Sequence, residues 1–188
     1  KSPFRRLTAD RTMTEEINSG IYSQDIIEFV TVATEYCVRL EQVQDGDMGT
    51  FVPAMLKILP LLYVKAMLLT GKGYDASGDV EQLVTEDDYN YVLSNVAAVM
   101  GSHDDYLDVF VEDMKYSDKP IRKTISEDLA DIYQDLRNFV GIFRQGYEET
   151  MEVSLAITME QFPHYWGQRI PCVMRALHDV MFMQEMDE

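Results

Sequence analysis

The residues with the clearest potential for chemistry are acids on one side of a predicted helix. Glu127, Asp131 and Asp135 recur every four residues, and Asp128 lies beside the first of them. At this spacing the carboxylates share a helix face and repel one another by roughly 0.2–0.5 kcal/mol per pair. Mg²⁺ or Mn²⁺ would relieve that repulsion, because hard cations take carboxylate oxygens as ligands. A solvated acidic face is the favoured alternative, since Glu127 and Asp128 fall where acids stabilise a helix N-terminus.

A metal site on these four acids would make the chain a divalent-metal-dependent hydrolase acting on a nucleotide or phosphoester. The segment Glu148–Glu152 matches the Glu-Glu-x-x-Glu run with which all-helical nucleotide pyrophosphatases hold magnesium. The Glu-x-x-Asp that follows in those enzymes is missing here, and first-turn acids account for the run. The sequence also has no zinc pattern, phosphate-binding glycine loop or serine nucleophile motif. We therefore predict no catalytic residue and no cofactor.

A second group of residues is a candidate surface for binding a partner. Three consecutive polar residues precede the acidic helix, one tyrosine lies within it, and an aromatic pair lies at the start of the last predicted helix. Aromatic residues often supply much of the binding energy at protein interfaces. The candidate binding surface consists of His103, Asp104, Asp105, Tyr133, Tyr165 and Trp166.

The net charge of the chain limits the classes of molecule that it is expected to bind. The chain has 33 acidic and 16 basic residues, for a formal net charge of −17. Such a field repels phosphate backbones and anionic membranes and attracts basic proteins. The leading prediction is a non-enzymatic protein-interaction or regulatory domain with a basic partner. An acidic mimic of nucleic acid is a further alternative, and no feature of the sequence sets the oligomeric state.

Length and composition indicate one globular domain. The chain has 188 residues with only 10 Gly and 6 Pro, which suits long helices. Its cysteines, Cys37 and Cys172, both lie among apolar residues and are expected to be reduced core residues. Reduced cysteines and the lack of a secretory signal pattern predict a cytoplasmic protein.

Apolar residues spaced by three and four predict an all-α fold, an antiparallel bundle of about six helices. Residues 1–20 lack this period and are expected to form a flexible basic arm, followed by a single domain over 21–188. Residues 102–120 are expected to contain a short helix and a loop. Thr50, Thr85 and Thr124 are expected helix caps, and Pro171 is a candidate start for the last helix. The expected helices span about 23–44, 50–70, 85–101, 124–146, 147–162 and 166–180.

The second predicted helix is apolar on almost every side. Its length is barely sufficient for a membrane span, and Pro53, Lys57, Pro60 and Lys65 interrupt it. We therefore expect a central helix packed on several sides, with a kink near Leu56 because Pro60 cannot donate a backbone hydrogen bond.

Five segments are similar to a bacterial family of uncharacterised all-helical proteins, the domain of unknown function 5063 family. They are EFVTVATEYC, MLKILPLLY, HDDYLDVF, YSDKPIRKTISEDLADIYQDLRNFV and YWGQRIPCVMRALH, and the similarity extends over about residues 25–180. The most specific part is Ser126–Leu136. The resemblance implies an all-helical fold and a bacterial origin and assigns no catalytic residue. Pro171 departs from the helix-forming residues expected at its position.

Overall fold

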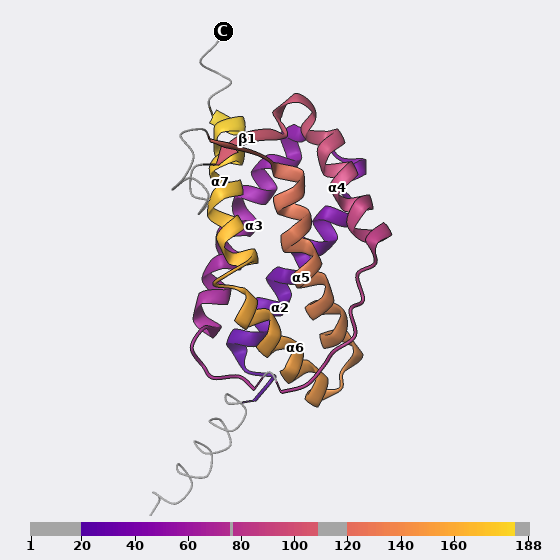
Figure 1. Cartoon of the computed structure of the whole chain (residues 1–188), viewed down its shortest axis with the longest axis vertical. Coiled ribbons are helices and arrows are strands. Elements are labelled where there is room, and N and C mark those ends of the chain that lie inside the picture. Colours follow the sequence, from indigo (N-terminus) through magenta and orange to yellow (C-terminus); the bar gives the residue numbers. More distant parts are fainter. Residues whose placement is uncertain (1–19, 76, 109–119, 183–188) are drawn as a thin grey trace, which may run out of the picture.

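The described residues form a bundle of six α-helices with a small β-hairpin at one end (Figure 1). The computed structural model describes residues 20–75, 77–108 and 120–182. The predicted N-terminal arm therefore lies outside the described residues except for Gly20. The all-α prediction is confirmed. The helices are α2 (Gln24–Glu41), α3 (Met48–Leu69), α4 (Glu86–Met100), α5 (Ile125–Gln145), α6 (Glu148–Gln161) and α7 (Trp166–Phe182).

Helix α5 is at the centre of the bundle and packs against α2, α4, α6 and α7. Its apolar stripe, which includes Leu129, Leu136 and Phe139, is fully buried. The hydroxyl of Tyr36 on α2 donates to the carbonyl of Leu129 at 2.8 Å. A buried polar group needs such a partner, so this bond fixes α2 against α5.

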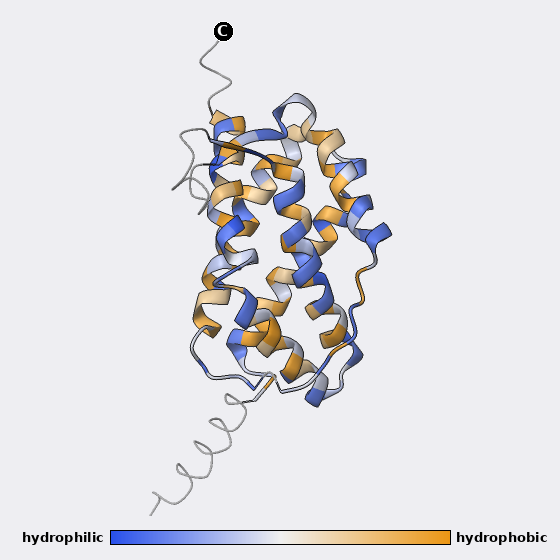
Figure 2. Cartoon of the chain, in the orientation of Figure 1, coloured by the Kyte–Doolittle hydropathy of each residue, from blue (hydrophilic) through white to orange (hydrophobic). Residues whose placement is uncertain are grey.

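Helix α3 is less enclosed than its sequence predicts. It packs against α2 and α7, but Leu61, Val64 and Leu68 on its outer side remain about half exposed. The expectation of a helix packed on several sides was therefore wrong, and α5 occupies that position. Among the described residues, α3 is the helix long and apolar enough to cross a membrane by length and composition, with 39% of its apolar window buried. Figure 2 shows its apolar residues interspersed with polar ones.

The helix starts follow local capping chemistry. Thr85 and Asp88 form the expected capping box at α4, and Thr124 accepts a hydrogen bond from the Glu127 amide at α5. At α3, however, the cap is the Asp47 side chain, which accepts from the Thr50 amide at 3.0 Å. The prediction of Thr50 as cap was wrong by one turn, because Asp47 is the stronger acceptor and lies three residues earlier.

Helix α7 begins at Trp166, so Pro171 lies inside it and does not start it. The proline leaves the carbonyl of residue 167 without its usual helical donor. The helix continues because Trp166, Ile170 and Val173 bury one continuous face on both sides of the proline. Burial of a large apolar side chain contributes about 1.5–3 kcal/mol, enough to offset one lost backbone bond.

Residues 105–124 contain a feature that the sequence did not predict. Strands β1 (Asp105–Asp108) and β2 (Ile121–Thr124) pair antiparallel, with Tyr106 opposite Lys123. The short helix expected around Tyr106 and Leu107 is therefore wrong, and the rest of that segment (109–119) lies outside the described residues. Alternation explains the strand: Tyr106 and Asp108 point into the protein, whereas Asp105 and Leu107 are exposed.

Candidate functional site

A cluster of charged side chains is enclosed where the hairpin meets α5 and α7. Its centre is Asp128 on α5, which is only 3% exposed. Asp128 accepts a hydrogen bond from the Tyr106 hydroxyl, and its carboxylate lies 3.7 Å from Arg169 Nε and 4.0 Å from Lys123 Nζ. Burial raises the pKa of Asp128, and these three donors oppose that shift by stabilising the carboxylate.

Asp131, one turn further along α5, links two more helices. Arg169 on α7 places Nη2 and Nε at 2.7 and 2.8 Å from its Oδ2 atom. The hydroxyl of Tyr89 on α4 donates to its Oδ1 atom at 2.8 Å. Burial and this bond raise the pKa of Tyr89, which therefore stays a neutral donor. Helices α4, α5 and α7 thus meet at one carboxylate.

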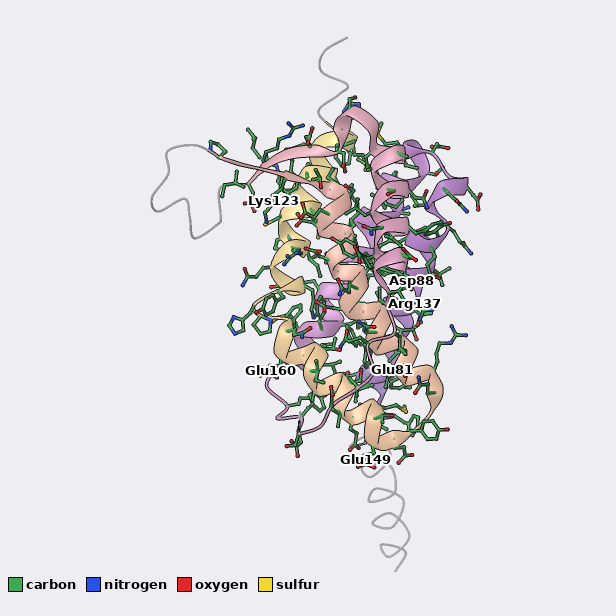
Figure 3. The ribbon with its side chains drawn as sticks, turned by 45° about the vertical axis from the view of Figure 1, so that its right-hand side comes forward. Glu81, Asp88, Lys123, Arg137, Glu149 and Glu160 are labelled. Atoms are coloured by element: carbon green, nitrogen blue, oxygen red, sulfur yellow. The ribbon has the colours of Figure 1, made fainter. Side chains whose placement is uncertain are left out.

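The hairpin is fixed to the same cluster through Lys123. Its Nζ atom lies 3.0 Å from the carboxylate of Asp108, which is 4% exposed (Figure 3). Burial of Lys123 disfavours its charge, but the bond to Asp108 and the nearby Asp128 keep the pKa of Lys123 above its usual value. Lys123 and Asp108 form an ion pair beside Asp128 of α5, and this contact holds the hairpin in place on the bundle.

A cavity of about 1040 Å³ opens beside this cluster. Its walls are β1, one face of α7, the turn before α7 and Tyr63 of α3. Phe162 and Ala176 are buried residues of this wall, while the half-buried thiol of Cys172 faces the cavity between them and β1. Burial and the nearby Asp108 raise the pKa of Cys172, so its thiol is mostly protonated near neutral pH.

A smaller cleft of about 280 Å³ lies on the other side of α7. Asp131, Asp135 and Arg169 line it together with the exposed ring of Tyr165. Burial raises the pKa of Asp135 to about 6, although the nearby Arg169 opposes the shift. Within the described residues, no basic side chain forms an ion pair with Asp135.

The four acids of the metal-site prediction are separated in the structure. Glu127 is exposed in the first turn of α5, Asp128 and Asp131 bind protein cations, and Asp135 lies in the smaller cleft. The described part of the chain contains no group of three or more His, Cys, Asp or Glu side chains that could hold a metal ion. Arg169 supplies to Asp131 and Asp128 the positive charge that a metal ion would supply in the metal-site alternative.

Three residues of the predicted binding surface lie at the two cavities described above. His103 and Asp105 line the larger cavity, and Tyr165 is 60% exposed at the smaller cleft. Asp104 instead accepts hydrogen bonds from the Ser126 amide and hydroxyl, at 2.8 and 2.7 Å, and so supports the start of α5.

Two of the aromatic residues in that prediction belong to the core. Trp166 is fully buried, and its Nε1 atom donates to the Thr158 carbonyl at 2.9 Å. Tyr133 is 3% exposed and donates to Glu41 at 3.0 Å. Their assignment to a binding surface was wrong, because each ring packs inside the bundle and its polar atom already has a partner.

Several residues of the site had no sequence signal. Tyr106, Asp108 and Lys123 meet through the unpredicted hairpin, and Arg169 reaches α5 from α7 through a contact between residues distant in sequence. The sequence Asp-Tyr-Leu-Asp over 105–108 does not alternate between polar and apolar residues, because the inward Asp108 is polar and the outward Leu107 is apolar, so it does not reveal the strand.

The chain is similar to a known protein family over most of its length. A family model described as a domain of unknown function (DUF5063) matches residues 20–183. The chain belongs to this family. The resemblance noted in the sequence is therefore confirmed, and in this member of DUF5063 the matched segment contains the charged cluster and both cavities.

A solved structure agrees with this assignment. The crystal structure of protein BF1032 from Bacteroides fragilis shares 44% sequence identity with this DUF5063 member, with a TM-score of 0.76. The match covers 86% of this chain and 95% of that chain. None of the curated proteins matches the chain. The family model thus establishes the family of the chain, and the similar solved structure supports its fold.

Proposed function

We propose that this chain is a protein-interaction domain that holds a segment of a basic partner protein in the cavity beside α7. The observation that carries the proposal is the cavity itself. Its volume of about 1040 Å³ is at the upper end of the range for ligand sites, roughly 300–1,000 Å³. Its walls combine apolar side chains such as Phe162 and Pro171 with polar ones such as Gln168 and Arg175.

The chemistry around the cavity favours binding over catalysis. The acids near it are engaged: Asp105 pairs with Arg122, and Asp179 with Arg175 at 3.0 Å. A nucleophile or general base needs a pKa near the working pH. Cys172 has its pKa shifted upward by burial, away from the thiolate that would attack a substrate.

Charge favours a basic partner. The acids Asp105, Asp108 and Asp179 line the cavity, but each already pairs with a protein cation, namely Arg122, Lys123 and Arg175. The preference for a basic segment therefore comes from the excess of acids over the whole chain. The whole chain adds a formal net charge of −17. A positively charged segment is attracted to such a surface, and its rate of association should fall as salt is added.

The proposal is tested with short peptides selected from a displayed random library on the wild-type protein. Gln168 is exposed on the cavity wall, so Gln168→Trp places a bulky ring in the cavity. Tyr147→Trp is the matched control, because Tyr147 is 69% exposed, precedes α6 and does not belong to the residues that line the cavity. Both variants are first checked by thermal unfolding.

We expect the selected peptides to be rich in Lys or Arg and to bind Gln168→Trp at least about tenfold more weakly, or ~1.4 kcal/mol. They should bind Tyr147→Trp as tightly as wild type. Equal binding to all three proteins, or no enrichment of peptides on the wild type, would contradict the proposal.

A further inference from the structure

Within the described part of the chain, β1 has a partner strand on one edge only, and its register shows which backbone groups lie on the other, free edge. The amide of Ile125 donates to the Asp104 carbonyl at 2.8 Å, so residues 104 and 125 form a hydrogen-bonded pair. Such pairs alternate along an antiparallel ladder. The backbone of Tyr106 and Asp108 therefore faces β2, whereas the amide and carbonyl groups of Asp105 and Leu107 face away from it.

This free edge borders the larger cavity. All four residues of β1 line the cavity, and none of the residues of β2 does. The opposite wall is the face of α7 that carries Gln168, Cys172 and Arg175. Figure 1 shows β1 lying across the upper end of α7. Within the described residues, the backbone groups of Asp105 and Leu107 have no backbone partner.

The edge is also held rigidly. The inward side chains of β1 are anchored by the bonds from Tyr106 to Asp128 and from Lys123 to Asp108. On the outer face, Arg122 of β2 pairs with Asp105. A strand fixed in this way can accept a further strand without an ordering cost of its own, and main-chain bonds of this kind supply affinity in peptide recognition.

From these observations we propose that the partner segment binds as an extended strand that adds to the free edge of β1, over the cavity. This inference rests on the proposed function and names the conformation and chemistry of the segment. Alternate residues of an added strand point to opposite sides. One set of side chains would enter the cavity towards Phe162 and Ala176, and the other set would lie on the outer face of the hairpin, beside the exposed Asp105 and Leu107.

The first test measures hydrogen exchange of single backbone amides by NMR, with and without a peptide selected as above. In the free protein, the Asp105 and Leu107 amides should exchange fast, while the Tyr106 amide is protected by β2. A saturating peptide should slow Asp105 and Leu107 by at least about tenfold and leave Tyr106 nearly unchanged. Unchanged exchange at Asp105 and Leu107 would overturn the inference.

The second test removes one donor from the edge. Leu107→Pro deletes an outward amide and keeps the pairing to β2, because proline is tolerated on edge strands. Leu107→Ala is the matched control, since it removes the same exposed side chain and keeps the amide. We expect peptide affinity to fall at least about fivefold more in Leu107→Pro than in Leu107→Ala. Equal affinities of the two variants would overturn the inference.

If Leu107→Pro does not fold, backbone bonding can be tested from the peptide side. A set of peptides is made in which one backbone nitrogen at a time is methylated. Methylation should weaken binding at alternate positions only. Equal weakening of binding at every methylated position would indicate a helical or irregular peptide and would overturn strand addition. In that case, weaker binding of the peptide to Gln168→Trp would still support the proposed function. Slower exchange at Asp105 and Leu107 with rising protein concentration alone would show that a second copy of the chain occupies the edge, and would also overturn the inference.

Discussion

Arg169 is the residue on which the charged cluster depends. It is the cation bound to Asp131 and the nearer of the two cations beside the buried Asp128. Truncating one partner of a buried ion pair leaves an uncompensated charge and typically costs about 3–5 kcal/mol. Because Arg169 is about one third exposed, we expect a smaller loss.

We predict that Arg169→Met lowers the free energy of unfolding by ~2–3 kcal/mol, measured by urea denaturation at neutral pH. The double variant with Asp131→Asn should recover part of that loss, because one of the stranded carboxylates is then neutral. Additive losses in the two single variants would show that the pair is not coupled.

Asp135 should make stability depend on pH. Its pKa is raised by burial to about 6, whereas the unfolded chain has the ordinary value of a carboxyl group, about 4. The folded state thus binds more protons between these values, and stability from this group is lost as pH rises from about 4 to about 6.

We predict that Asp135→Asn raises the free energy of unfolding at pH 7 by ~1–2 kcal/mol and that this gain vanishes below about pH 4. Denaturation curves across this range test it. Glu127→Gln, an exposed acid on the same helix, is the matched control for removing one negative charge. A gain that persisted unchanged at low pH would contradict the burial of the carboxyl group.

At the scale of elements, the sequence predicts long helices well and the hairpin not at all. The helix over 125–145 was predicted because its buried stripe repeats every three or four residues and Thr124 caps it. The two strands have four residues each and carry acids and bases on their inward face. Their polar character conceals the alternation, because the buried inward residue Asp108 is an acid that pairs with Lys123.

The same limit applies to the site. The spacing of four residues places Glu127, Asp131 and Asp135 on one side of α5, since spacing within a helix is local information. Which cations meet those acids depends on how α7 and the hairpin pack, and that is set by contacts distant in sequence. Arg169 and Lys123 were therefore missed, although Asp128 and Asp131 were named.

The start of α3 gives a prediction at this scale. Asp47 accepts from the Thr50 amide, whereas Thr50 only donates its hydroxyl to the Asp47 carbonyl. We predict that Asp47→Ala lowers the free energy of unfolding by ~1 kcal/mol, as loss of a helix cap does. Thr50→Ala should cost less than half as much in the same thermal unfolding measurement. The reverse order would show that Thr50 is the effective cap.

At the scale of the whole molecule, the acidic charge bears on the choice between a metal and a protein partner. A metal at a hundred times its dissociation constant would stabilise the fold by ~2.7 kcal/mol. Because Arg169 already neutralises Asp131, we predict no ion-specific rise in Tm with millimolar Mg²⁺, Mn²⁺, Ca²⁺ or Zn²⁺ relative to EDTA. A rise with one ion that vanished in Asp131→Asn would bring the hydrolase alternative forward.

The central claim is that the cavity beside α7 is where the partner segment binds, and Cys172 can report on it directly. Cys172 lines the cavity and is half buried, whereas Cys37 is buried in the core. The rate of Cys172 modification by a thiol reagent is measured with and without a saturating selected peptide. We predict that the peptide slows the reaction at least about tenfold, because its side chains cover the thiol. An unchanged rate at saturation would place the peptide elsewhere and contradict the claim.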